Sequence, residues 1–356
     1  MQAALSLARR GLGNVWPNPA VGCLILRDGL VVGRGWTQPG GRPHAETEAL
    51  RRAGTAARGA TCYVTLEPCA HHGRTPPCAD ALIEAGVARV VVGAGDPDPR
   101  VDGRGQTKLR EAGIAVEIGV CAEAAAALNA GFIGRVAQGR PLVALKAATS
   151  LDGRIATASG ESQWITGPQA RQRGHLLRAC HDAILIGSGT LEYDDPSLTC
   201  RLPGLEHRSP VRVVLDSEGR IPAGAAILRD AGEVPVWVVT ADPDALQGRL
   251  PAGAEAIGVS RGGDGKLDMT AVLSALAQRG ITRLLVEGGA GVATTLLRDG
   301  LVDRLYWFRA PLLIGGAGLP LFGDLEVEAL SAASRLRYRG CEQIGQDVLE
   351  IYDRQS

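Results

Sequence analysis

Short apolar runs alternate with amphipathic stretches along the first 140 residues of the chain. The apolar runs predict buried strands, and the stretches between them have the spacing of helices. Alternation of this kind predicts a layered α/β domain with its site at the carboxyl ends of the strands. We expect strands at 21–26, 31–33, 61–66, 87–93 and 115–118, and helices at 2–12, 44–53, 76–85, 107–112 and 123–129.

The same alternation restarts after Arg140-Pro141, where we place a domain boundary. A chain of 356 residues is long enough for two domains with separate cores. The expected domains are residues 1–140 and 141–356, and both belong to the α/β class. In the second domain we expect strands at 142–147, 183–186, 211–215, 236–239, 283–286 and 304–308, and helices at 168–179, 270–278 and 292–298.

The charge pattern favours a small phosphorylated partner. The formal net charge is zero, which argues against a large nucleic-acid surface, whereas the first 140 residues carry 16 basic and 12 acidic side chains. No apolar run is long enough to cross a bilayer, and the N-terminus lacks the segments of a signal peptide. Six of the eight cysteines are scattered singly, which favours free thiols. We therefore expect a cytoplasmic protein that binds a small molecule and neither nucleic acid nor membrane.

One histidine and two cysteines in the first domain are the residue types of a zinc site. His44, Cys69 and Cys78 would supply three ligands and leave the fourth tetrahedral position to water, as in catalytic zinc sites. Glu46 is near in sequence, and zinc nucleobase deaminases use a glutamate that is not a ligand as general acid/base. A structural zinc with a fourth ligand from His71-His72 is the alternative, but it leaves Glu46 without a role.

The second domain has no G-x-G-x-x-G sequence after its first strand, so an ordinary Rossmann site is not expected. Instead, residues 287–295 (EGGAGVATT) follow an expected strand and open a helix. Glycines there expose backbone N–H groups at the positive end of the helix dipole, which suits a phosphate. A tight turn without a ligand is the alternative. Lys146 lies in an otherwise apolar strand, and this favours a functional site.

Three segments of the first domain closely resemble the bifunctional deaminase–reductase family of riboflavin biosynthesis. They are PNPAVG at 17–22, HAE at 44–46 and EPCAHHGRTPPC at 67–78. The resemblance implies a cytidine-deaminase-like α/β/α domain in which His44, Cys69 and Cys78 bind zinc and Glu46 is the proton donor. Eight residues lie between the two cysteines, where the general deaminase signature has two, and the longer loop is the rule in this family.

The same resemblance implies a pocket for a pyrimidine ribotide phosphate beside the zinc. Its residues would be Asn18, Arg74, Asp96 and Asp98, and the charge of Arg74 suits the phosphate. Asp98 stands where the family pattern has an asparagine. An acid is less favourable than an amide beside a phosphorylated substrate.

Loops of the second domain resemble the reductase domain of the same family, which is similar in fold to dihydrofolate reductase and uses NADPH. The loops are SLDG at 150–153, SQWITG at 162–167, GSGT at 187–190 and DDPSLTCR at 194–201. The resemblance implies that Lys146 polarises or protonates the ring-opened sugar. It places at the nucleotide Ala148, Trp164, Thr190, Asp194 (or its neighbour Asp195), Ser217, Gly289, Ala290, Gly291, Val292, Ala293, Thr294 and Thr295. It places at the substrate Ser162, Arg178, Leu198, Arg201 and Glu287. The two arginines would hold the 5′-phosphate, and Glu287 would accept hydrogen bonds from sugar hydroxyls.

Together these features predict an enzyme for two successive steps. The first is hydrolytic deamination of 2,5-diamino-6-ribosylamino-4(3H)-pyrimidinone 5′-phosphate, and the second is reduction of the ribosyl group to ribityl. The expected cofactors are Zn²⁺ and NADPH, and the expected assembly is a homo-oligomer. Two alternatives stay open: a zinc deaminase of a free nucleoside or tRNA base with an inactive second domain, and a nucleotide-binding regulator whose zinc is structural.

Overall fold

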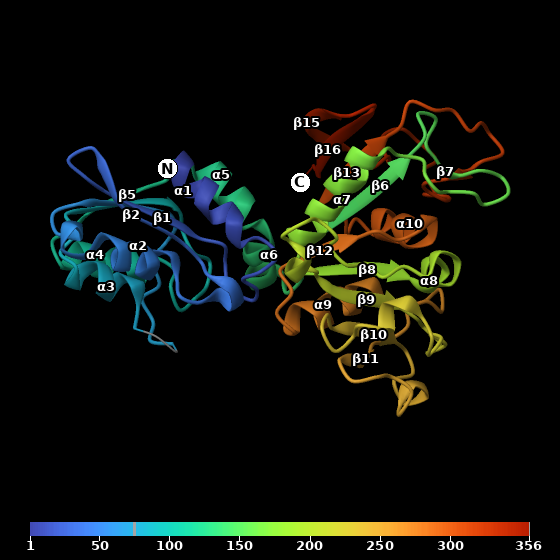
Figure 1. Cartoon of the computed structure of the whole chain (residues 1–356), viewed down its shortest axis with the longest axis horizontal. Helices are drawn as coiled ribbons and strands as arrows, with labels where there is room; N and C mark the ends of the chain where they lie inside the picture. The colour runs from blue at the N-terminus through green and yellow to red at the C-terminus, as the bar shows by residue number, and fades with distance from the viewer. Residues whose placement is uncertain (74–75, 356) are drawn as a thin grey trace. The chain divides into compact units, whose positions relative to one another are not determined.

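The chain divides into two compact units, Met1–Arg140 and Pro141–Ser356. The computed structural model describes residues 1–73 and 76–355 (Figure 1). Both units combine a sheet with helices, as the alternation of apolar runs and amphipathic stretches predicts. In the part of the chain that is described, no helix has the length and apolar character needed to span a bilayer.

The first unit is built on a five-stranded sheet. Its strands are β1 Gly22–Arg27, β2 Leu30–Trp36, β3 Thr61–Leu66, β4 Arg89–Ala94 and β5 Ala115–Ile118. Its helices are α1 Gln2–Ala8, α2 Ala45–Ala53, α3 Cys78–Glu84, α4 Arg104–Glu111, α5 Ala122–Leu128 and α6 Ala130–Gln138, with 3₁₀ turns at Arg9–Gly11, Pro39–Gly41 and Gly54–Ala57. The strand order is β2-β1-β3-β4-β5. Strand β1 is antiparallel to β2 and β3, whereas β3, β4 and β5 are parallel to one another.

Helices cover both faces of this sheet (Figure 1). Ala49 of α2 and Leu82 of α3 pack with the strand residue Val64 in the larger apolar cluster. Leu5 of α1 and Leu128 of α5 belong to a second, smaller cluster. The first unit therefore has the three layers that the α/β/α expectation requires.

Two glycines of β2 let helix α2 lie directly against the sheet. A Cβ atom at Gly35 would come within 2.2 Å of the carbonyl oxygen of Ala45, and one at Gly33 within 2.3 Å of that of Ala49. No larger residue fits at either position unless the backbone of α2 moves. This close approach fixes the height of the first turn of α2, which carries Glu46.

The second unit is built on a nine-stranded sheet. Its strands are β6 Leu142–Thr149, β8 Ala183–Gly187, β9 Val211–Leu215, β10 Val236–Thr240, β11 Ala254–Gly258, β12 Arg283–Val286, β13 Arg304–Arg309, β15 Leu336–Ile344 and β16 Asp347–Arg354, and β7 Arg154–Ala156 pairs separately with β14 Leu319–Pro320. Its helices are α7 Pro168–Ala179, α8 Ser188–Asp194, α9 Met269–Gln278 and α10 Ala290–Arg298, with 3₁₀ turns at Glu206–Arg208, Ala226–Leu228 and Asp244–Leu246.

The strand order of this sheet is β11-β10-β9-β8-β12-β6-β13-β16-β15. Every pair from β11 to β13 is parallel, and only β16 and β15 are antiparallel additions. The carboxyl ends of the parallel strands therefore meet at one edge, where α/β sheets bind ligands.

Some elements of the second unit lack a sequence signal. Strand β15 exposes most of its side chains and so has no apolar run, and β11 buries only Ile257 fully. Helix α8 is seven residues long, too short for an amphipathic pattern to be recognised. These three elements were therefore not predicted. Strands β16, β7 and β14 were also missed.

The helix expected at 123–129 continues beyond that range as α5 and α6, which meet at Asn129. The side chain of Asn129 accepts a hydrogen bond from Ala20 N (2.9 Å) and donates one to Ala20 O (3.1 Å). The break between the helices thus fastens the segment that carries Asn18. The helix expected at 2–12 ends earlier, at Ala8, and gives way to a 3₁₀ turn.

Candidate active sites

The three residues expected to bind zinc lie together in the first unit. His44 Nδ1 is 3.3 Å from Cys78 Sγ and 3.6 Å from Cys69 Sγ, and the three ligand atoms all lie within 4.8 Å of one another. Zinc bonds of about 2.0–2.3 Å in a tetrahedron place ligand atoms roughly 3.5 Å apart, so the residues fit the ion. No fourth His, Cys, Asp or Glu of residues 1–73 and 76–355 joins this cluster, and His71-His72 lies outside it. The donor set is that of a catalytic site.

Each ligand stands where a regular element begins or ends. His44 is the N-cap of α2, Cys78 is the first residue of α3, and Cys69 follows β3. The backbone N–H of Cys78 donates to Cys69 Sγ at 3.3 Å. Hydrogen bonding to Cys78, against the effect of burial and with a contribution from His44, lowers the pKa of the Cys69 thiol to about 4. Cys69 is therefore a thiolate, the form that binds metal.

Glu46 is buried beside this cluster without belonging to it. Its side chain is 3% exposed, on the first turn of α2, two residues after His44. Burial raises the pKa of Glu46 to about 7, against the attraction of His44. A carboxyl group with a pKa near neutrality can both take up and release a proton at physiological pH.

The Asp96–Asp98 turn follows β4 and is held by its own side chains. Asp96 Oδ1 accepts from Asp98 N at 2.9 Å, and burial raises the pKa of Asp96 to about 6. Asp98 forms an ion pair with Arg100, which lowers the pKa of the Asp98 carboxyl group. The negative charge of Asp98, which is less favourable than an asparagine amide beside a phosphate, is therefore offset by Arg100 within the turn.

Of the other two residues predicted to contact the substrate in this unit, the structure describes Asn18 only. Asn18 packs against Gly41, where a Cβ atom would come within 2.0 Å of Asn18 Nδ2. Gly41 has φ +83° and lies in the turn that leads to His44, so Asn18 lies against the loop before the zinc ligand. Arg74 lies outside the described residues.

Glu67 has a structural role that its place in the Glu67-Pro68-Cys69 motif did not reveal. Its buried carboxylate accepts from the backbone N–H groups of Gly103 (3.2 Å), Gly105 (3.1 Å) and Gln106 (3.3 Å), and from Gln106 Nε2 (2.8 Å). It therefore caps the N-terminus of α4 from the strand end that also leads to Cys69. This cap joins the loop after β4 to the zinc ligand.

Replacing Glu67 with glutamine should lower the free energy of unfolding by about 1–3 kcal/mol, because one acceptor oxygen cannot satisfy all these buried donors. The effect is measured as the midpoint of unfolding in a urea titration. The matched control is Glu84→Gln, at an exposed position at the end of α3, which should leave the midpoint unchanged. Equal midpoints for the two variants would contradict the capping role.

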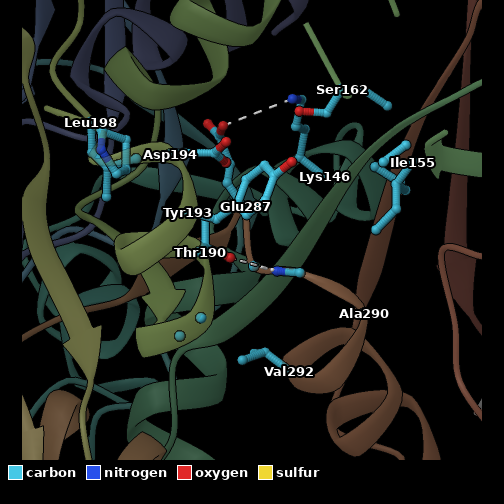
Figure 2. Close-up of a pocket in the computed structure, with 18 of the residues that line it drawn as sticks. Lys146, Ile155, Ser162, Thr190, Tyr193, Asp194, Leu198, Glu287, Ala290 and Val292 are labelled. Carbon is cyan, nitrogen blue, oxygen red and sulfur yellow. Dashed lines mark hydrogen bonds and ion pairs between the residues drawn. The ribbon is translucent and has the colours of Figure 1, made fainter. Parts of the chain in front are cut away.

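A cavity of about 1290 Å³ lies in the second unit at the carboxyl ends of β6, β8, β9 and β12 (Figure 2). Pockets for drug-sized ligands span about 300–1,000 Å³, so this one has room for a dinucleotide and a second small molecule. Most of the predicted reductase residues line it: Lys146, Ala148, Ser162, Trp164, Arg178, Thr190, Asp194, Leu198, Arg201, Ser217, Glu287, Gly289, Ala290, Gly291, Val292 and Thr295.

Two residues predicted at the nucleotide lie away from the cavity wall. Ala293 is completely buried on the inner face of helix α10. The hydroxyl of Thr294 donates to Ala290 O (2.6 Å) and accepts from Gly323 N (2.8 Å). Periodicity explains this result, because only part of a helical turn can face a ligand.

Lys146, Glu287 and Arg178 form a charged group at one part of the cavity. Val286 pairs with Leu145 in the parallel register of β12 and β6, so Glu287 and Lys146 are the next residues on these two neighbouring strands. Glu287 makes a bidentate pair with Arg178 (2.8 and 2.9 Å), and Lys146 Nζ is 3.8 Å from Glu287 Oε2 (Figure 2). Burial opposes ionisation of Glu287, but Arg178 and Lys146 outweigh it and hold its pKa at about 2.

This pairing changes the expectation for the two arginines. Arg178 uses two nitrogens on Glu287 and a third on the carbonyl oxygen of Thr199 (3.0 Å), so it is not free to grip a phosphate. Arg201 is more exposed and donates from its guanidinium to Ser197 Oγ (2.9 Å). Of the two, Arg201 is the better placed to hold an anion.

His175 also lines this part of the cavity, and the sequence analysis missed it. Its Nδ1 accepts from the backbone N–H of Arg201 at 3.3 Å. Burial, Arg178 and Arg201 lower its pKa to about 4, so the ring is neutral and carries its proton on Nε2. Its position three residues before Arg178 on α7, on the same helix face, is the signal that could have found it.

The glycine-rich turn after β12 opens helix α10. Gly289 is the N-cap, and its N–H donates to Thr190 Oγ1 at 3.0 Å (Figure 2). The carboxylate of Asp195 accepts from Ala226 N (2.7 Å), which leaves Asp194 as the less constrained of the two neighbours. The turn presents backbone N–H groups to the cavity as a phosphate cradle would.

Two family models match the chain. The model described as the cytidine and deoxycytidylate deaminase zinc-binding region matches residues 1–94, and the model described as the RibD C-terminal domain matches residues 141–349. These matches confirm the prediction of a cytidine-deaminase-like domain followed by a reductase domain.

Relatives cover nearly the whole chain. The riboflavin biosynthesis protein RibD of Escherichia coli (strain K12) is 44% identical, over 98% of this chain and 96% of its own length. The structure of Acinetobacter baumannii RibD (form 1) is 41% identical with a TM-score of 0.90, and the match covers 100% of this chain and 98% of that one. The diaminohydroxyphosphoribosylaminopyrimidine deaminase/5-amino-6-(5-phosphoribosylamino)uracil reductase of Thermotoga maritima is 37% identical with a TM-score of 0.89, over 100% and 97% of the two chains.

Proposed function

The chain belongs to the RibD family of riboflavin biosynthesis, and on that premise we propose a site and a substrate for each of its two steps. Members of this family are bifunctional deaminases and reductases, and the chain is one such enzyme, with zinc and NADPH as cofactors. We assign deamination to residues 1–140 and reduction to residues 141–356.

The first unit deaminates 2,5-diamino-6-ribosylamino-4(3H)-pyrimidinone 5′-phosphate in this proposal. The observation that carries it is the His44, Cys69 and Cys78 cluster with Glu46 buried beside it. When bound, zinc activates the attacking water. Glu46 takes one proton from that water and passes it to the ring nitrogen. It then takes the second proton from the hydroxyl on the tetrahedral carbon and gives it to the amino group, which departs as ammonia. Its burial keeps this proton in the site.

The substrate contacts of this unit are part of the proposal. The predicted residues are Asn18, Arg74, Asp96 and Asp98. Asn18 lies against the loop that leads to His44, and Asp96 lies close enough to Cys69 for their charges to interact, which supports these two. Asp98 and its partner Arg100 form the outer part of the turn.

The second unit reduces the ribosyl group of the deaminated product to ribityl. NADPH supplies the hydride when bound. Lys146 donates a proton to the ring-opened sugar, and the ionised Glu287 pairs with Lys146 and accepts from a sugar hydroxyl. Arg201 binds the 5′-phosphate with the neutral ring of His175 beside it, and Arg178 positions Glu287.

The alternative functions fit less well. A deaminase with an inactive second half leaves the match to the RibD C-terminal domain unexplained. A regulator with a structural zinc needs a fourth protein ligand, which the described residues do not provide at the cluster. We also propose a cytoplasmic location, because all eight cysteines are free thiols. Assembly as a homo-oligomer remains a prediction for analytical ultracentrifugation.

Removal of zinc should separate the two activities. Treatment with a zinc chelator should abolish ammonia release from the diaminopyrimidine ribotide, because zinc activates the attacking water. NADPH oxidation with the deaminated ribotide should continue, because the reductase cavity belongs to the other compact unit. Both reactions are followed on one sample, and added Zn²⁺ should restore the first. Ammonia release that survives complete zinc removal would contradict the assignment.

A further inference from the structure

A loop for which the sequence predicted no function contributes a cation to the reductase cavity. The loop runs from Arg261 to Leu267, which pair with each other, and it connects β11 to α9. It is held by hydrogen bonds from Gly262 N to Lys266 O (2.7 Å) and from Arg261 to Gly265 O (2.6 Å). Lys266 lines the cavity, and among residues 1–73 and 76–355 its ammonium group has no ion-pair partner.

The sheet order places this loop on the opposite side of the cavity from Lys146. The cavity extends along neighbouring strands in the order β9-β8-β12-β6. Adjacent strands lie about 4.8 Å apart, so the ends of β9 and β6 are about 14 Å from each other. Arg261 donates to Ser217 O (3.2 Å), just after β9, whereas Lys146 is on β6. Lys266 therefore lies on the β9 side and Lys146 on the β6 side.

An extended dinucleotide fits this separation in one direction. Its nicotinamide must lie beside the sugar at Lys146 and Glu287, and its diphosphate suits the N–H groups of the glycine turn after β12. The adenosine ribose then reaches the end of β9, at Ser217 and Lys266. NADPH and NADH differ at this ribose alone, by the 2′-phosphate of NADPH.

The charges at this end suit a phosphate. Glu218, next to Ser217, would repel an anion, but its carboxylate is paired with Arg261 at 2.6 Å. Two further carboxylates belong to this loop: Asp264 accepts from the backbone N–H of Lys266 at 3.0 Å, and Asp268 caps the N-terminus of α9. Neither forms an ion pair with the ammonium group of Lys266, which therefore stays available to a phosphate. We propose that Lys266 binds the 2′-phosphate of NADPH and so determines the preference for NADPH over NADH, an inference that rests on the proposed reductase function of this cavity.

Lys266→Ala should raise the KM for NADPH about tenfold, the effect of losing one charge-assisted contact, and should leave kcat nearly unchanged. The KM for NADH, measured in parallel, should not change, since NADH has nothing for Lys266 to bind. Lys266→Arg should restore most of the affinity because it keeps the charge. The control is Lys108→Ala in the first unit, which should change neither value.

Two results would overturn the proposal. The first is an unchanged KM for NADPH. The second is an equal increase in the KM for NADPH and in the KM for NADH, which would mean that Lys266 stabilises the cavity and does not recognise the 2′-phosphate. Binding of adenosine 2′,5′-bisphosphate and of 5′-AMP, measured by calorimetry, tests the same point without turnover: only the bisphosphate should lose affinity in Lys266→Ala. If the wild type bound the bisphosphate through Lys266 but reduced no ribotide, the proposed function would fail and the phosphate site would stand.

Discussion

Glu46→Gln should lower the rate of ammonia release roughly a thousandfold, within the range that a positioned general acid/base contributes. Glutamine has the same shape and fills the same buried space, but it cannot carry the proton from water to the ring nitrogen. Glu46 is not one of the clustered ligand residues, so the variant should retain its zinc. Ammonia release from the ribotide and metal content of the purified protein are the two measurements.

Helix α2 offers a matched control for this variant. Glu48, also mostly buried, pairs at the surface with Arg51 (3.1 Å) and Arg52 (3.3 Å), so its negative charge serves the helix and not the site. Glu48→Gln should keep near-normal ammonia release. A Glu46→Gln protein that retained both zinc and activity would remove Glu46 from the mechanism, and one that had lost zinc would place it among the ligands.

Lys146→Met should lower kcat for reduction of the deaminated ribotide by about a hundredfold or more, because the sugar loses its proton donor. Glu287 keeps its bidentate partner Arg178 in this variant, so the buried carboxylate is not left unpaired. The fold should therefore survive, whereas removing Glu287 would leave two buried cations without their anion. NADPH oxidation is the measurement.

The deaminase supplies the internal control for this second variant. Its site belongs to the other compact unit, so ammonia release by Lys146→Met should equal that of the wild type. Loss of both activities would indicate misfolding. Full NADPH oxidation would mean that Lys146 has no part in the hydride step.

The sequence predicted those parts of the molecule that depend on local patterns. Apolar runs indicated every parallel strand except β11, and the zinc ligands could be found because each stands at the end of a strand or the start of a helix. Strand β15 of the β15–β16 hairpin could not be found in this way, because it exposes most of its side chains and carries no apolar run. Its pairing depends on the rest of the sheet.

The charges in the two sites were harder to predict than their residues. The sequence contains Arg178 and Glu287, but only the fold shows that they neutralise each other, and this moves the proposed phosphate contact to Arg201. Arg100 likewise offsets Asp98, two residues away. A residue type predicts a possible role, and its nearest partner then decides whether it is available for that role.

The glycines of β2 show that the chemistry of the first unit also depends on positions that have no side chain. A methyl group at Gly35 would meet the backbone of α2 at 2.2 Å, one residue before Glu46. The residue types that this strand position can accept are thus limited by the proton transfer that we propose for Glu46 on the neighbouring helix. A deaminase of this architecture can lose its activity through a substitution that touches neither the metal ligands nor the substrate and changes no charge.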